Sequence, residues 1–91
     1  MNPMETVNSA LDVARQRLGE APAIEMFASI VRQLEYLAGV LSGEDGDRSK
    51  LKDVIVGHYA AREIEGNDPE FAEALYDVQA IASKMARGLK P

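Results

Sequence analysis

Apolar side chains recur every three or four positions in three long stretches of the chain, which is the spacing of one face of an α-helix. The three apolar faces consist of Met4, Val7, Leu11, Ala14 and Leu18; of Phe27, Ile30, Leu34, Leu37 and Leu41; and of Phe71, Leu75, Val78, Ala82 and Met85. Asn2 and Asp68 each precede a proline, which is typical of a helix N-cap. Gly19, Gly43 and Gly88 supply stop signals. The pattern therefore predicts helices over residues 3–18, 22–42 and 69–87.

Residues 48–65 form a further predicted helix, with Asp47 as its cap, but their apolar pattern differs. One face carries Leu51, Val54 and Ile55. A second stripe, made of Val56, Ala60 and Ile64, lies nearly opposite on a helical wheel. A helix that is apolar on both sides is either central in its bundle or covered by a partner, and the sequence leaves both open. The β-branched residues would also suit a strand, but no neighbouring segment offers a second strand, so a helix is predicted.

These elements predict an all-α fold, a small four-helix bundle that forms a single domain over residues 1–91. The chain has no cysteine, which excludes disulfides and thiolate metal clusters and favours a reducing cytoplasm. It also lacks a long apolar run and a signal-peptide pattern, so we expect a cytoplasmic protein that does not enter a membrane.

The charge balance narrows the class of partner. Fifteen acidic residues against ten basic ones give a net charge of −5. Nucleic-acid binding normally needs a basic patch, and an anionic membrane surface would repel this chain. The composition is compatible with a basic protein partner.

Two connections between predicted helices are rich in acids, "GEDGDRSKL" at 43–51 and "EIEGNDPE" at 63–70. A calcium loop that starts at Asp45 would need glycine at its sixth position and glutamate at its twelfth, where this chain has Lys50 and Val56. No metal site or cofactor is therefore predicted. Helix capping and the helix dipole account for several of these acids. The surplus consists of Glu44, Asp45, Glu63 and Glu65.

His58, the only histidine, shares the predicted face of Leu51 and Val54, so we expect a mainly packed ring. The serines have no visible acid–histidine partner, and no phosphate-binding glycine loop is present, so catalysis has no support in the sequence. Tyr36 and Tyr76 fall off the apolar faces and Tyr59 lies at a margin. Tyrosine is favoured in protein interfaces, although covering a loop edge would explain these three residues equally well.

From Gln33 onward the chain resembles the small helical immunity proteins of type VI secretion, and it is most similar to the immunity partner of the effector that hydrolyses NAD and NADP. The resemblance covers about two-thirds of the chain. It rests on the order and spacing of "QLEYL", "DRSKL" at 47–51, "GHYAARE" at 57–63, "NDPEFAEAL" at 67–75 and "RGLK" at 87–90. It implies a helical protein without catalysis that binds a cognate effector toxin and obstructs its active site. Because clefts that handle nucleotides are often positive, we expect the toxin to be basic around that active-site cleft.

We therefore predict a partner-binding surface that joins the surplus acids to the tyrosines and to the second apolar stripe. Its residues are Tyr36, Glu44, Asp45, Val56, Tyr59, Glu63, Glu65 and Tyr76. On a straight helix of eighteen residues the two acidic connections would lie about 27 Å apart, so a partner would have to lie along that helix. Two alternatives stay open: a histidine phosphotransfer module that uses His58 beside Arg62, and a homodimeric scaffold that pairs through Val56, Ala60 and Ile64.

Overall fold

Three helices of 18 residues dominate the computed structural model, which describes residues 2–91. They are α1 (Pro3–Glu20), α2 (Glu25–Ser42) and α4 (Pro69–Ala86). Between α2 and α4 lie a 3₁₀ turn, η1 (Leu51–Asp53), the short helix α3 (Val56–Tyr59) and a single π-helical turn, η2 (Ala60–Ile64). No residue from 2 to 91 is in a strand. The predicted all-α fold is confirmed.

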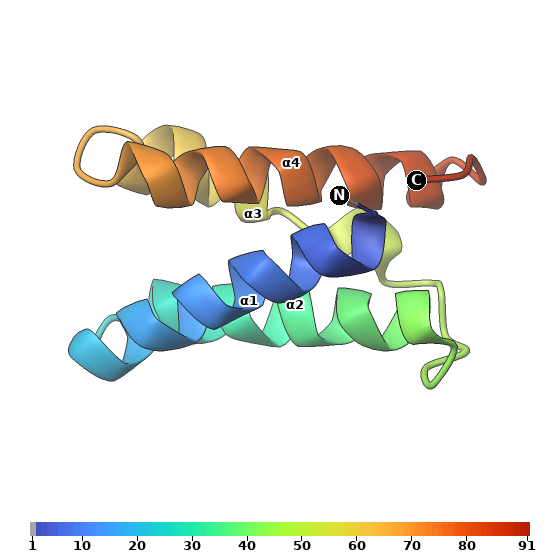
Figure 1. Cartoon of the computed structure of the whole chain (residues 1–91), viewed down its shortest axis with the longest axis horizontal. Coiled ribbons are helices and arrows are strands. Elements are labelled where there is room, and N and C mark those ends of the chain that lie inside the picture. Colours follow the sequence, from blue (N-terminus) through green and yellow to red (C-terminus); the bar gives the residue numbers. More distant parts are fainter. Residues whose placement is uncertain (1) are drawn as a thin grey trace.

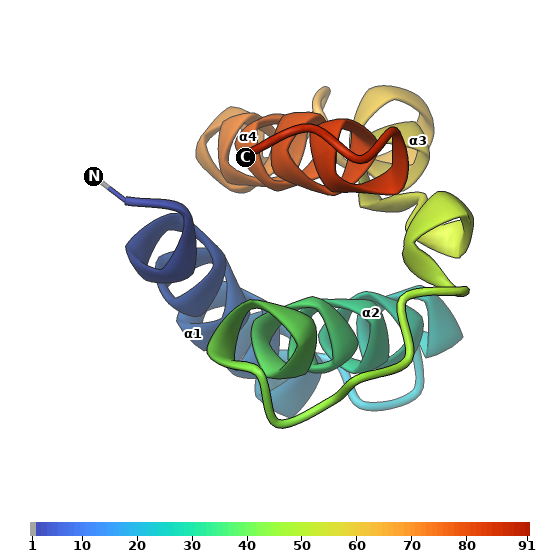
Figure 2. The same cartoon turned by 90° about the vertical axis from the view of Figure 1, so that its right-hand side faces the viewer.

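The helical segments surround one apolar interior. Helices α1 and α2 form an antiparallel hairpin, and α4 lies across from it (Figures 1 and 2). Helix α3 lies alongside α4, and η1 occupies the side between α2 and α4 (Figure 2). All of these segments contribute to a single cluster of buried apolar side chains. No polar or charged side chain in the described chain is buried. The molecule measures 33 × 23 × 21 Å, so its two ends are well separated surfaces.

The ends of the long helices follow local chemistry. The Asn2 side chain accepts a hydrogen bond from the Glu5 N–H (2.8 Å), and the Asp68 carboxylate accepts one from the Phe71 N–H (3.3 Å). Gly43 ends α2 in the left-handed conformation at φ 84°, which glycine adopts without steric cost. The predicted start of α2 at residue 22 is wrong by three residues, because Pro22 lies in a turn ahead of the helix.

The predicted continuous helix over 48–65 is also wrong. The backbone leaves the helical conformation at Val54 (φ −74°, ψ 114°) and Ile55 (φ −126°, ψ 26°), between η1 and α3. The physical reason is the pair of opposite apolar stripes, which one straight helix could not turn toward one core. With the break, both stripes are buried, from Leu51 and Val54 on one side to Val56, Ala60 and Ile64 on the other.

Two glutamines from the long helices satisfy the backbone at this break. The Gln33 side-chain oxygen accepts a hydrogen bond from the Ile55 N–H (2.7 Å). Gln79 accepts from the Gly57 N–H (3.0 Å) and donates to the Val54 carbonyl (2.8 Å). A Cβ atom on Gly57 would lie 2.9 Å from Cγ of Gln79, so the close approach requires glycine. These contacts fix how α3 is presented to solvent.

Asp47 does not cap a helix, contrary to the prediction, because the helical turn starts four residues later, at Leu51. Its carboxylate instead accepts hydrogen bonds from the N–H (2.9 Å) and the hydroxyl (2.6 Å) of Ser49. Those bonds hold the pKa of Asp47 below its usual value. The Tyr36 hydroxyl donates to the Asp47 carbonyl (2.7 Å), which ties this connection to α2.

Candidate partner-binding surface

The acids in the predicted contact set are divided between the two ends of the molecule. Glu44 and Asp45 belong to the connection that follows α2 at one end, whereas Glu63 and Glu65 belong to the segment before α4, at the end that also holds the α1–α2 turn (Figure 1). The expectation of a straight helix joining the two acidic sites fails because the chain between them is broken. The structure therefore does not bring all of the predicted residues together.

The prediction that Val56 faces a partner is wrong. Its side chain is completely buried, at 0% exposure, and Ala60 and Ile64 are buried with it. The stripe that looked surplus in the sequence belongs to the core. For the same reason these three residues cannot form a homodimer interface in this fold.

The prediction of a packed His58 ring is wrong as well. His58 is exposed, because the break at Val54 and Ile55 turns α3 so that its Val56 side enters the core. Arg62 lies one turn further along the same segment and lines the same surface hollow.

That hollow, which we call the tip hollow, lies between the start of α2 and the segment formed by α3 and η2. Its volume is about 400 Å³, and its lining consists of Ile24, Met26, Ile55, His58, Tyr59, Arg62 and Glu63. Ile24 is 46% exposed and is one of two large apolar side chains in the described chain that are exposed; the other is Leu89 at 52%. The Tyr59 hydroxyl lies 3.4 Å from the Ser29 hydroxyl, which links this segment to α2.

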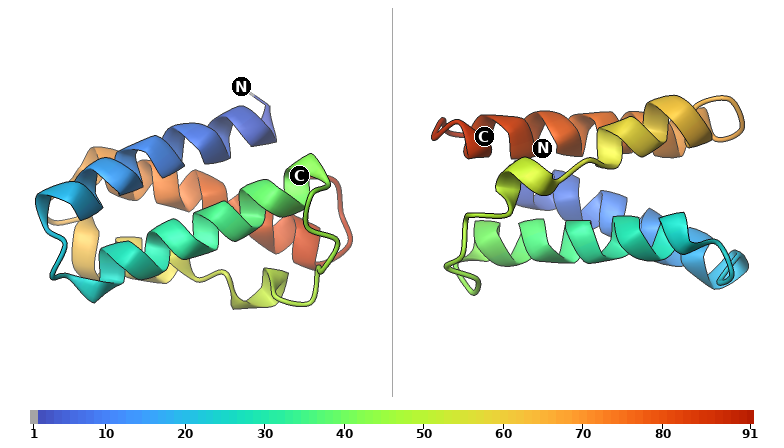
Figure 3. Two further views of the ribbon diagram at one scale, coloured as in Figure 1. Left: turned by 90° about the horizontal axis from the view of Figure 1, so that it is seen from below. Right: turned by 180° about the vertical axis from the view of Figure 1, so that it is seen from behind.

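The three tyrosines of the predicted set lie in different surroundings. Tyr36 lines a smaller hollow of about 240 Å³ together with Gln33, Asp53 and Val54. The segment that contains η1 and α3 runs between α2 and α4 (Figure 3, right). Partial burial raises the pKa of Tyr36. Tyr76 belongs to α4, and partial burial together with the neighbouring Glu65 carboxylate raises its pKa.

A third hollow, between α1 and α4, contains acids that the sequence analysis missed. Its volume is about 550 Å³, and its α4 wall carries Glu70, Glu73 and Asp77. None of these three has an ion-pair partner among the described residues. Their spacing of three and four positions, which puts them on one face of α4, is the signal in the sequence that could have found them.

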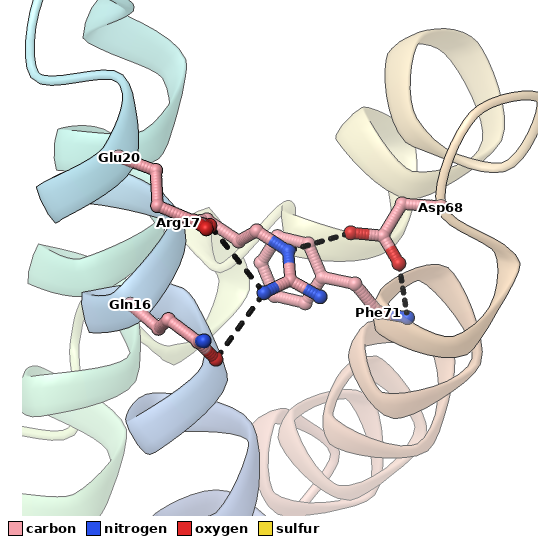
Figure 4. Close-up of polar contacts among 5 residues, drawn as sticks. All are labelled: Gln16, Arg17, Glu20, Asp68 and Phe71. Atoms are coloured by element: carbon pink, nitrogen blue, oxygen red, sulfur yellow. Dashed lines mark hydrogen bonds and ion pairs between the residues drawn. The ribbon is translucent and has the colours of Figure 1, made fainter.

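Arg17 joins α1 to α4 (Figure 4). Its Nε donates to Oδ2 of Asp68 at 2.7 Å, and its guanidinium carbon lies 5.9 Å from the centre of the Phe71 ring. Hydrogen bonding within this pair holds the pKa of Asp68 below and that of Arg17 above their ordinary values. Arg17 also lies 3.6 Å from the Glu20 carboxylate. The positive charge of Arg17 is therefore shared between Asp68 and Glu20 and does not neutralise the other acidic side chains nearby.

Charge is distributed unevenly along the molecule. We define the acidic tip as residues 20–25 and 63–70, which carry Glu20, Glu25, Glu63, Glu65, Asp68 and Glu70. These two ranges contain no lysine or arginine, but Arg62 directly precedes the second range and lines the tip hollow. The far end, residues 43–53 and 84–91, carries six bases: Arg48, Lys50, Lys52, Lys84, Arg87 and Lys90. It also holds four acids: Glu44, Asp45, Asp47 and Asp53. Glu63, Glu65 and Glu70 have no ion-pair partner in the described chain.

Within residues 2–91, no three histidine or acidic side chains are grouped as metal ligands would be. A search of the same residues for a helix that is both long and apolar enough to cross a membrane finds none.

Comparison with known proteins shows which family this chain belongs to. The Tsi6 family model matches residues 2–84. Immune protein Tsi6 of Pseudomonas aeruginosa is 36% identical over 90 residues, which cover 99% of this chain and 96% of that protein. A chain in the solved structure of Tse6 in complex with Tsi6 superposes with a TM-score of 0.92 at 36% identity, over 99% of this chain and 96% of that one. The structure of Tsi6 from Pseudomonas aeruginosa gives 0.87 at 35% identity, over 100% of this chain and 95% of that one.

The helical fold and these relatives define the class as small helical immunity proteins. The chain belongs to the Tsi6 family.

Proposed function

We propose that this chain is an immunity protein that binds a cognate type VI effector toxin and blocks the toxin's active site. The observation that carries the proposal is its likeness to a relative solved in complex with Tse6, at a TM-score of 0.92 over 99% of this chain. By the resemblance in sequence, the cognate effector is an NAD(P)+ glycohydrolase. The protein acts in the cytoplasm by binding and not as an enzyme.

The surface chemistry supports a protein partner. An excess of acids over bases favours encounter with a basic surface and raises the association rate more than the affinity. Tyrosines supply contact area with a polar tip. The proposed contact residues are those of the predicted set that remain at the surface: Tyr36, Glu44, Asp45, Tyr59, Glu63, Glu65 and Tyr76.

The phosphotransfer alternative keeps part of its geometric basis, since His58 is exposed and Arg62 lines the same hollow. Family membership nevertheless favours immunity over phosphotransfer. Incubation with a phosphohistidine donor separates the two functions: we expect no phosphoryl group on His58, and a labelled histidine would favour the alternative.

Inhibition of the cognate toxin domain, sought as the product of the neighbouring gene, tests the proposal. We expect the purified chain to form a stable complex with that domain, and NAD+ hydrolysis by the domain to fall to background at equimolar chain. A complex that still hydrolyses NAD+ would refute active-site blockade but not binding. A toxin domain that binds and is neutralised without cleaving NAD+ would refute the glycohydrolase assignment alone. Absence of any complex would refute the proposed function.

A further inference from the structure

We propose that the acidic tip, with Ile24 and the tip hollow as its apolar anchor, is the end of the molecule that docks into the effector, and that it meets a basic surface there. This inference rests on the proposed function and adds the orientation of docking. The proposed contact residues are divided between the two ends of the molecule, and this inference assigns docking to one of those ends.

The tip hollow offers what an anchor site needs. Ile24, Met26 and Ile55 supply apolar surface, and Tyr59 supplies an aromatic ring with a polar tip. Ile24 is 46% exposed at the rim although it is a large apolar residue. Energetically dominant contacts in protein interfaces typically fill such pockets near the centre of the buried area, surrounded by a polar rim. Here that rim consists of His58, Arg62 and Glu63.

The charge around the hollow specifies the partner's chemistry. Three tip acids, Glu63, Glu65 and Glu70, lack an ion-pair partner in the described chain, and Arg17 is already engaged by Asp68 and Glu20. Arg62 on the rim of the hollow is one base against these three acids. Uncompensated acids at one end attract a partner surface that carries lysine or arginine. The far end would repel such a surface or meet it weakly, because its six bases outnumber its four acids. Shape and charge therefore select the same end.

The backbone at the tip is also specialised. A single π-helical turn, in which the Glu65 N–H donates to the Ala60 carbonyl at 2.8 Å, directs residues 60–65. Turns of this kind are rare and occur frequently at functional sites. Here the turn keeps Ile64 in the core while Arg62, Glu63 and Glu65 stay exposed.

Matched variants inside and outside the acidic tip test the inference by kinetic binding to the cognate toxin domain, sought as the product of the neighbouring gene. The tip variants are Ile24→Ser and Glu63→Lys/Glu65→Lys. The controls are Leu89→Ser, which alters the other exposed large apolar side chain, and Asp12→Lys/Asp53→Lys, which makes the same change in net charge at two exposed acids that lie outside both the acidic tip and the proposed contact set. Thermal unfolding of every variant is measured alongside, so that a loss of binding can be told apart from a loss of folding.

We expect Glu63→Lys/Glu65→Lys to slow association about tenfold at low salt and to flatten its salt dependence. We expect Ile24→Ser to speed dissociation about tenfold or more. Both controls should stay within about twofold of wild type. Two outcomes would overturn the inference and leave the proposed function standing. In the first, wild type binds and the tip variants bind equally well. In the second, the controls lose binding while the tip variants do not. If wild type itself does not bind the toxin domain, the proposed function fails and this inference fails with it.

Discussion

At the scale of single residues, Asp68 has two roles that can be separated by substitution. One oxygen accepts the Phe71 N–H and caps α4, while the other accepts Arg17 Nε at 2.7 Å. Both side chains of the ion pair are about three-quarters buried, with 26% and 28% exposure. Such a pair is less screened by solvent than a surface pair. An asparagine side chain can still accept the hydrogen bond that caps α4, but it lacks the negative charge that pairs with Arg17. Alanine provides neither interaction.

We predict that Asp68→Asn costs about 1 kcal/mol of unfolding free energy and Asp68→Ala about 2 kcal/mol at neutral pH. Urea unfolding monitored by circular dichroism measures both. If the two variants are equally stable, the cap contributes nothing; if Asp68→Asn matches wild type, the pair with Arg17 contributes nothing.

The same pair predicts a pH dependence. Hydrogen bonding to Arg17 lowers the pKa of Asp68 in the folded state. Its contribution is therefore fully present above the unfolded value of about 3.9 and is lost as pH falls through the lower folded value. The stability gap between wild type and Asp68→Asn should stay constant from pH 7 to about 5 and shrink in stronger acid. A gap that does not shrink in stronger acid would contradict this linkage.

His58 is the residue whose role changed most between sequence and structure. Since its ring is exposed, we predict that His58→Ala changes the unfolding free energy by no more than about 0.5 kcal/mol. Thermal or urea unfolding checks this, with Val56→Ala as the contrasting variant that creates a cavity and costs about 1–3 kcal/mol. A large loss in His58→Ala would return the residue to the packed role first expected.

At the scale of elements, the break before α3 depends on Gln79 and Gly57 together. Alanine at 57 would push its Cβ to 2.9 Å from Cγ of Gln79, and moving that side chain would sacrifice its bonds to the backbone of Val54 and residue 57. We predict that Gly57→Ala costs about 1–3 kcal/mol in the wild-type background. In a Gln79→Ala background the obstacle is gone, and the same change should be neutral or stabilising by up to about 1 kcal/mol, because alanine favours helix over glycine.

A double-mutant cycle over the two positions measures this coupling by urea unfolding. The matched control is Gly66→Ala, whose Cβ would meet nothing within 4 Å. Additive effects of Gly57→Ala and Gln79→Ala would show that the close contact does not constrain the break.

These elements also show what sequence could and could not predict. The three long helices were predictable because their apolar spacing, caps and stops are local, as at Asn2, Asp68 and Gly43. The break was not, because it depends on Gln33 and Gln79, each 22 residues from the amide that it accepts. Burial of Val56 and exposure of His58 both follow from the break. The ion pair of Arg17 with Asp68 spans 51 residues and left no local signal.

At the scale of the whole molecule, the long and short helical elements pack on one core, but their backbone hydrogen bonds are satisfied in different ways. Helices α1, α2 and α4 have 18 residues each and continuous backbone ladders. Segment 51–64 consists of three pieces of 3, 4 and 5 residues, and side chains from α2 and α4 satisfy part of its backbone. Segments with less internal hydrogen bonding open at lower free energy than the global unfolding reaction.

We therefore predict that hydrogen exchange in the free protein is fastest, apart from the chain ends and turns, in residues 51–64. Leu51, Val54, Val56, Ala60 and Ile64 hold this segment to the core, so its amides should be protected but exchange through local opening. Hydrogen exchange followed by mass spectrometry at several denaturant concentrations tells local opening from global unfolding. Exchange through local opening depends weakly on the denaturant concentration, whereas exchange through global unfolding depends on it strongly. Gln79→Ala should speed exchange across 54–60 more than in α1, whereas the matched surface change Gln16→Ala should not. Equal protection of segment 51–64 and α1 in wild type would show that the broken segment unfolds only with the whole molecule.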